Sequence, residues 1–148
     1  MKGTIIMKYL KISIAAFMVA FICAAVGIKA YAYHGYTGIS LPILKGTTTK
    51  GPQTKTQTGL QYYENTGTIN QCTGNENGVQ VAVQSEAGGT SAWLVLASAG
   101  QTGSWANNSK STVIRSYNIK MKNNTSSPCT ASHSGIWYLD KGAYNLIH

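Results

Sequence analysis

The sequence predicts an all-β protein, and three observations lead to that class. Apolar and polar residues alternate from Val79 to Gln84, which is the pattern of a strand with one buried face. No stretch after residue 32 carries a convincing stripe of apolar residues at the 3.6-residue spacing of an amphipathic helix. Turn signals recur about every ten residues, as in folds built of short strands. We therefore expect a small antiparallel β-sandwich, Ig-like or jelly-roll-like, with one disulfide.

The first part of the chain has the composition of a secretory signal peptide. Lysines precede an apolar run, and small residues at Ala30 and Ala32 suit a signal peptidase. This pattern predicts a helical signal peptide over residues 1–32, cleavage after Ala32 and an extracellular mature chain. An uncleaved anchor is the alternative, but the apolar run falls short of the ~20 residues that span a bilayer. Met1 and Met7 are both possible starts, since a complete n-region follows each.

Residues 33–59 are expected to form a flexible arm before the folded domain. From Lys45 to Gly59 the chain is rich in Thr, Lys and Gly and has no apolar side chain, so burial cannot offset the entropy of ordering it. Pro42 excludes a central strand from the apolar stretch around it, which leaves an edge strand or a docking segment. The β-sandwich domain is expected at 60–148.

Five stretches of the domain have the pattern of strands. The stretch 79–84 precedes a Gly88-Gly89 hairpin signal. The stretch 91–99 is apolar on both faces, which predicts a central strand. Apolar and polar residues alternate again in 109–122, and two short apolar stretches close the chain. The expected strands are 79–84, 91–99, 109–122, 135–139 and 143–147.

Cysteine usage predicts one disulfide. Cys23 leaves with the signal peptide, so the mature chain keeps Cys72 and Cys129, and two thiols in an exported chain usually pair. On the chain-entropy model, closing the loop between them contributes about 4 kcal/mol to stability. His133 follows Cys129 by four residues. Instead of a disulfide, Cys129 could therefore form a metal-binding pair with His133, or act as a nucleophile with His133 as its base. Too few ligands accompany them for a metal site, and a reduced thiol is not expected outside the cell.

Charge narrows the partners of the mature chain. Loss of the lysines in residues 1–32 lowers the formal net charge from +8 to +4. This mild excess does not favour nucleic acid, and it fits loose attraction to anionic cell-wall or membrane-surface polymers. Residues 101–124 are the strongest candidate contact because they carry no acidic residue. Their basic side chains, all candidate binding residues, are Lys110, Arg115, Lys120 and Lys122.

Aromatic residues supply the other candidate binding residues, since tryptophan and tyrosine combine an apolar ring with a polar group. Trp93 lies in an apolar stretch and is expected in the core, whereas Trp105 lies beside a loop and is assigned to neither core nor surface. Trp137 and Tyr138 point to opposite faces of one strand, so one of them should face solvent. Arg115 falls on the expected inner face of its strand. It is either a buried anion or carbohydrate contact, a side chain that reaches the sheet rim, or a residue beside a bulge that resets the register.

The mature chain has few side chains suited to catalysis. The mature chain has four acids in or beside expected turns, where solvated charges are typical: Glu64, Glu76, Glu86 and Asp140. The sequence has no recognisable nucleophile elbow, phosphate-binding loop or pair of carboxylates placed for glycoside hydrolysis. We therefore expect no enzymatic activity, no catalytic residue, no metal and no cofactor.

Residues 104–140, SWANNSKSTVIRSYNIKMKNNTSSPCTASHSGIWYLD, resemble small uncharacterised secreted proteins of Gram-positive bacteria. The NNSKST and SGIW stretches are also similar to bacteriocins of the lactococcin 972 type, which combine a signal peptide with a small β-sandwich. The cysteines and the Thr/Lys-rich arm differ from that pattern. We expect a secreted, non-enzymatic β-sandwich that binds at the cell surface or cell wall, with a bacteriocin-like antimicrobial or toxin as the alternative. Ligand and oligomeric state are left open.

Overall fold

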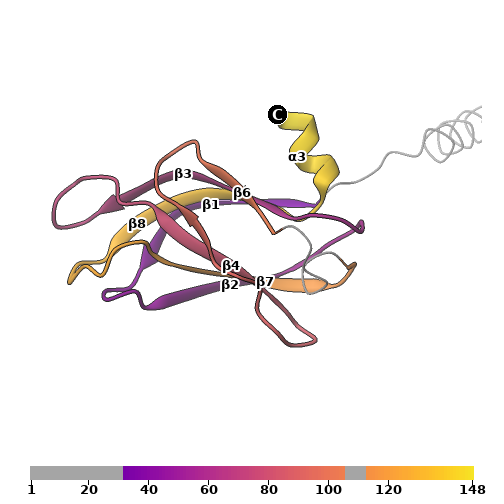
Figure 1. The fold of residues 1–148 in the computed structure, drawn as a ribbon, viewed down its shortest axis with the longest axis horizontal. Helices are drawn as coiled ribbons and strands as arrows, with labels where there is room; N and C mark the ends of the chain where they lie inside the picture. The colour runs from indigo at the N-terminus through magenta and orange to yellow at the C-terminus, as the bar shows by residue number, and fades with distance from the viewer. Residues whose placement is uncertain (1–31, 106–112) are drawn as a thin grey trace, which may run out of the picture. The chain divides into compact units, whose positions relative to one another are not determined.

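The computed structural model describes residues 32–105 and 113–148. Within these ranges, two four-stranded antiparallel sheets pack as a sandwich (Figure 1), which confirms the predicted class. Sheet A has the strand order β1-β8-β3-β6 and sheet B the order β2-β7-β4-β5. The elements are β1 (Tyr33–Leu41), β2 (Thr47–Thr54), β3 (Tyr62–Asn70), β4 (Val79–Ser85), β5 (Leu94–Leu96), β6 (Thr102–Ser104), β7 (Ser116–Asn123), β8 (Ala131–Tyr138) and the helix α3 (Lys141–Ile147).

The core lies between the two sheets and follows the alternation that the sequence predicts. Neighbouring strands place their buried side chains in register, as in the pairs Val81 with Met121 and Val83 with Ile119. Full burial of an aliphatic side chain contributes about 1.5–3 kcal/mol. Fully buried apolar residues from the two sheets include Leu41, Tyr63, Val79, Val81, Val83, Tyr117, Ile119, Met121 and Trp137.

The expected flexible arm is wrong for most of residues 33–59, because they form β1 and β2. β1 pairs with β8, and β2 pairs with β7. Both are edge strands, so the stretch before Pro42 is confirmed as an edge strand. Backbone pairing and β-branched threonines stabilise β2 without a continuous apolar face. A bulge between Lys50 and Gln53 accommodates Pro52, which cannot donate to the ladder.

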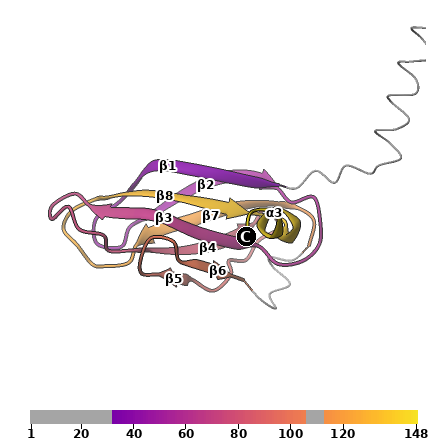
Figure 2. The ribbon, with the colours of Figure 1, turned by 90° about the horizontal axis from the view of Figure 1, so that it is seen from above.

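Two other stretches differ from their predicted strands. Residues 91–99 form only the short strand β5 at the edge of sheet B, not a central strand. Residues 143–147 belong to helix α3, which follows the end of β8 (Figure 2). Tyr144 of this helix stacks on Tyr62 of β3, with ring centroids 4.2 Å apart. This contact holds the helix against sheet A, and a short apolar run alone does not distinguish helix from strand.

The predicted hairpin between β4 and β5 is confirmed. Gly88 and Gly89 have φ angles of 99° and 84°, which suit glycine, and the backbone N–H of Ser85 donates to the carbonyl of Gly89 at 3.2 Å. The predicted signal peptide before Ala32 lies outside the described residues, as does Lys110. Among the residues that are described, no helix is long and apolar enough to cross a membrane.

Candidate functional site

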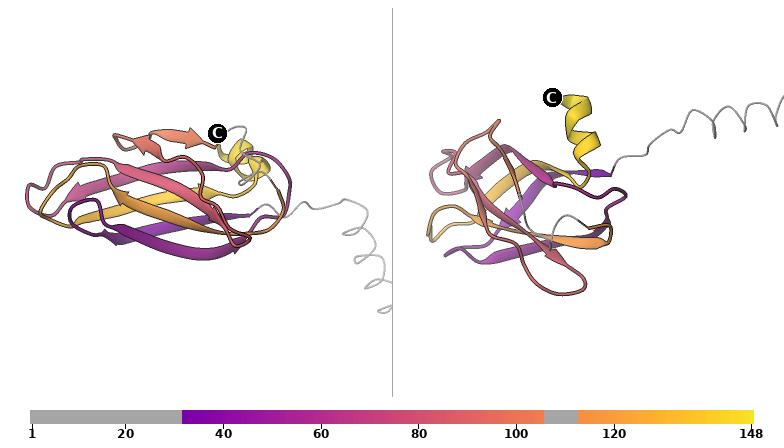
Figure 3. Two further views of the ribbon diagram at one scale, coloured as in Figure 1. Left: turned by 60° about the horizontal axis from the view of Figure 1, so that its bottom comes forward. Right: turned by 45° about the vertical axis from the view of Figure 1, so that its right-hand side comes forward.

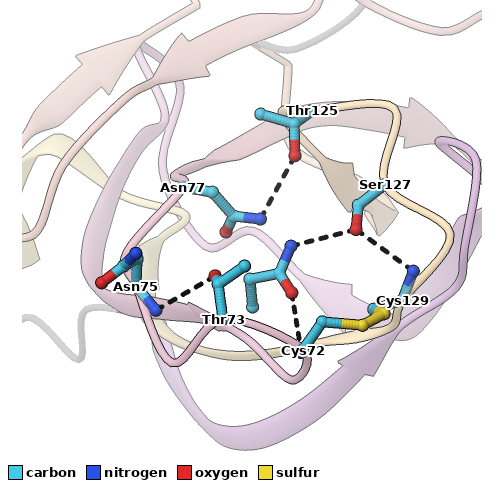
Figure 4. The surroundings of a disulfide bond; sticks show 8 residues. Cys72, Thr73, Asn75, Asn77, Thr125, Ser127 and Cys129 are labelled. Carbon is cyan, nitrogen blue, oxygen red and sulfur yellow. Dashed lines mark hydrogen bonds between the residues drawn. A yellow bond between two sulfur atoms is a disulfide. The ribbon is translucent and has the colours of Figure 1, made fainter.

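Cys129 forms the predicted disulfide with Cys72, with their Cα atoms 5.8 Å apart. The bond joins the end of β3 to the loop before β8 (Figure 4). Asn70 supports both ends, because its Oδ1 accepts from the backbone N–H of Cys72 at 2.8 Å and its Nδ2 donates to Oγ of Ser127 at 3.0 Å. Ser127 Oγ in turn accepts from the backbone N–H of Cys129 at 3.1 Å. Cys129 is therefore a structural cross-link.

His133 lies in the core and not beside a reactive thiol. Its Nε2 is 2.7 Å from the hydroxyl of Tyr63, and its Nδ1 is 2.6 Å from the hydroxyl of Thr68. Burial lowers the pKa of His133 to about 4, so the imidazole is neutral at physiological pH. Within the described ranges, no group of three or more His, Cys, Asp or Glu side chains is placed to hold a metal ion.

Asp140 is not the solvated turn charge that the sequence suggested, because it is fully buried with Lys55. Lys55 Nζ lies 3.5 Å from Asp140 Oδ1 and also donates to the carbonyl of Leu139. The Asp140 carboxylate further accepts from the backbone N–H groups of Gln57 at 2.9 Å and Ala32 at 2.8 Å. These contacts join the chain after β2 to the chain after β8, so this charged pair is structural.

The pKa values of this pair reflect two opposing effects. Burial lowers the pKa of Lys55, and the neighbouring Asp140 charge opposes that shift. Burial by itself raises the pKa of Asp140. Hydrogen bonds from Thr56, Ala32 and Gln57, together with the charge of Lys55, outweigh it and leave the pKa below its ordinary value. Asp140 is therefore ionised at neutral pH.

Three aromatic candidates lie in the interior. Trp105 is 3% exposed and its Nε1–H donates to the carbonyl of Ala92 at 3.0 Å, which places this residue in the core. Trp137 is fully buried, and its Nε1–H donates to Oε1 of Gln61 at 2.9 Å. Tyr138 is also fully buried. The expectation that either Trp137 or Tyr138 faces solvent is wrong, because the C-terminal helix packs over the outer face of β8, with Tyr144 edge-on to Tyr138.

Arg115 lies just before β7, so it does not occupy the inner face of that strand. Its side chain is exposed, and Nη1 donates to Oγ of Ser85 at 3.2 Å. The reading of a side chain at the sheet rim is therefore confirmed, and the reading of a buried anion contact is wrong.

Lys120 and Lys122 point outward from β7, alternating with the buried residues Ile119 and Met121. The Nζ atom of Lys122 lies 4.0 Å from the ring centroid of Trp93, a cation–π contact. Trp93 is half-buried and lies outside the core, so its predicted core position is wrong. Leu94 packs against the core, so the neighbouring Trp93 turns outward, and the apolar composition of both faces of this stretch concealed that alternation.

These side chains form a polar, basic surface, which we call the basic face. It is the outward side of sheet B around Lys120, Lys122 and Trp93. Register places Gln80 of β4 beside Lys122, and Gln84 beside Asn118 of β7. None of the four strands of sheet B contains an acidic residue. The nearest acid along the chain is Glu86, whose backbone N–H donates to the carbonyl of Ser116 at 3.2 Å.

No family model matches this chain, and no curated protein or solved structure matches it either.

Proposed function

We propose that this is a secreted, non-enzymatic β-sandwich protein that binds anionic polymers of the cell surface or cell wall through its basic face. The observation that carries the proposal is the position of the Lys122 ammonium 4.0 Å from the ring centroid of Trp93. A lysine held over an aromatic ring loses less side-chain entropy when it binds an anion than a free lysine does. Lys122 is therefore partly organised for an anionic ligand.

The arrangement of the face suits a linear polymer. Lys120 and Lys122 are two residues apart on one side of a strand, which separates their Cα atoms by about 6.8 Å. Two cations in line match a chain that carries anionic groups at regular intervals. The amides of Gln80, Gln84 and Asn118 offer hydrogen bonds to hydroxyl or phosphate oxygens beside that line. Because these side chains are half-buried and their charged groups lie at the surface of the sheet, we expect weak binding that falls as salt is added.

Of the two sandwich types that the sequence left open, we infer the jelly roll. Eight strands in the orders β1-β8-β3-β6 and β2-β7-β4-β5 correspond to a double-sheet jelly roll. That architecture is used by lectin domains among others, so it is compatible with glycopolymer binding. Fold alone does not assign function, and the contacts of the basic face remain the main support.

Retention on purified cell wall or on an anionic polymer tests the proposal. The double variant Lys120→Gln/Lys122→Gln should elute at lower salt than the wild type. Lys141→Gln, which makes the same kind of charge change on helix α3, is the matched control and should elute with the wild type. Retention that ignores salt, or equal retention of all three proteins, contradicts the proposal. If the protein inhibits bacterial growth and the double variant inhibits it as strongly as the wild type does, the bacteriocin-like alternative is favoured.

A further inference from the structure

The turn from Pro42 to Gly46, which connects β1 to β2, has an unusual backbone. Its two central residues, Leu44 and Lys45, have φ angles of 52° and 60°. The backbone N–H of Gly46 donates to the carbonyl of Ile43 at 2.9 Å, which closes the turn. Turns with positive φ at both central positions strongly prefer Asn-Gly, and a bulky side chain in this region is an outlier. The sequence therefore has a leucine at a position where the backbone favours another residue.

The turn is also held firmly in place. A Cβ atom at Gly46 would lie 2.7 Å from Cβ of Pro42, so the two ends of the turn pack closely. The backbone N–H of Leu44 donates to the carbonyl of Ser127 at 2.9 Å, which fastens the tip to the loop before β8. The side chains of Ile43 and Leu44 nevertheless point away from the core, with exposed fractions of 46% and 66%. Burial within the described residues does not offset the strain of the turn.

The surroundings of this tip are mostly uncharged. The turn lies at the same end of the sandwich as the β3–β4 and β7–β8 loops (Figures 1 and 3). Side chains of these two loops near the disulfide are small amides and hydroxyls, among them Thr73, Asn75, Asn77, Thr125 and Ser127 (Figure 4). Glu76 is the acid of the β3–β4 loop, and Lys45 supplies a cation at the tip itself.

We propose that the Pro42–Gly46 turn docks on the surface of an anionic lipid bilayer. Ile43 and Leu44 enter the boundary between headgroups and acyl chains, while Lys45 contacts lipid phosphates. An anionic bilayer has an apolar interior beneath a layer of negatively charged headgroups. A projecting apolar pair followed at once by a lysine can contact both layers. Strained backbone residues that the surrounding structure holds in place are found preferentially at functional positions. The turn is close to the basic face, because Thr47 directly after it pairs with Lys122 of β7, but the side chains of Ile43 and Leu44 are not part of that face.

Binding of the purified mature protein to vesicles tests this proposal. The vesicles contain phosphatidylglycerol and phosphatidylcholine in equal parts, and bound protein is measured by sedimentation. Leu44→Asn should weaken binding roughly tenfold or more, as expected for one lost apolar side chain. The same substitution should raise the melting temperature, because asparagine tolerates a positive φ better than leucine. Lower affinity together with higher stability is not expected of a residue that only supports the fold.

Leu146→Asn is the matched control, because Leu146 is 74% exposed on helix α3; it should bind vesicles as the wild type does. Leu44→Asn should also keep the salt-dependent retention on anionic polymer, whereas Lys120→Gln/Lys122→Gln should lose it. The two sites are thereby tested separately. Equal vesicle binding by wild type and Leu44→Asn overturns the proposal. Absence of wild-type binding to these vesicles overturns it as well, and would leave a protein partner as the occupant of the turn.

Discussion

The ammonium of Lys55 lies 3.5 Å from Oδ1 of Asp140, and neither side chain is exposed to solvent. Removing one member of a buried pair leaves the other charge without compensation, which typically costs 3–5 kcal/mol. We therefore expect Lys55→Met and Asp140→Asn each to lower the free energy of unfolding by about that amount, as measured by urea denaturation. The exposed change Lys141→Met is the control and should have little effect. A loss below about 1 kcal/mol in either single variant, as for an exposed pair, would contradict this role.

The buried imidazole of His133 predicts a loss of stability in mild acid. Burial lowers its pKa to about 4 in the folded chain, whereas an unfolded histidine titrates near 6.5. Between these values the unfolded chain binds more protons, so the stabilisation is complete above about 6.5 and is lost as pH falls toward 4. The free energy of unfolding should fall by about 3 kcal/mol in total once the pH is below the folded pKa of His133.

Urea denaturation as a function of pH measures this effect, and His133→Gln is the comparison because its side chain does not titrate. The variant should show a nearly flat stability between neutral pH and the folded pKa of His133. Below that window Asp140 adds its own pH dependence in both proteins, because its pKa is held below the ordinary value and protonation removes its contribution. Equal pH dependence of wild type and His133→Gln above pH ~4 would argue against the buried imidazole as the cause.

The sequence predicted the elements whose physics is local. Alternation identified β4 and β7 because one face of each strand is buried against the opposite sheet. The cysteine count, together with the expectation that the chain is exported, predicted the bond between Cys72 and Cys129, which the structure confirms. Gly88 and Gly89 marked a turn because few other residues adopt their backbone angles.

Errors arose where distant parts of the chain decide the outcome. β2 has no apolar pattern, and its pairing with β7 orders it instead. Residues 143–147 form a helix against sheet A, held by the stacking of Tyr144 on Tyr62, which sequence periodicity cannot reveal. The same helix buries Tyr138, a predicted surface contact. Among the candidate binding residues that the structure describes, Lys122 lies against a half-buried aromatic ring, and that ring belongs to Trp93, which was expected in the core.

The cross-link between Cys72 and Cys129 should dominate the response to reductant. Opening it restores unfolded-state entropy worth about 4 kcal/mol on the chain-entropy model, so reduction should lower the melting temperature markedly. The double variant Cys72→Ser/Cys129→Ser should melt at the reduced value and be indifferent to reductant. Mass spectrometry of the oxidised protein should find one disulfide-linked peptide pair and no free thiol. A thiol that reacts in the native protein would disprove the cross-link.

Tryptophan fluorescence provides a direct test of the basic face. Trp105 and Trp137 are 3% and 0% exposed, so an aqueous quencher reaches chiefly Trp93. Iodide should be drawn to that ring by Lys122, whereas neutral acrylamide should not. We expect Trp93→Phe to remove most of the iodide quenching and Trp105→Phe to leave it in place. Lys122→Gln should weaken quenching by iodide while preserving or increasing quenching by acrylamide.

An anionic polymer that binds the basic face should protect Trp93 from iodide at low salt, and the protection should disappear as salt screens the contact. Iodide quenching that persists in Trp93→Phe would place the accessible ring elsewhere and remove the main support for a ligand at Lys122.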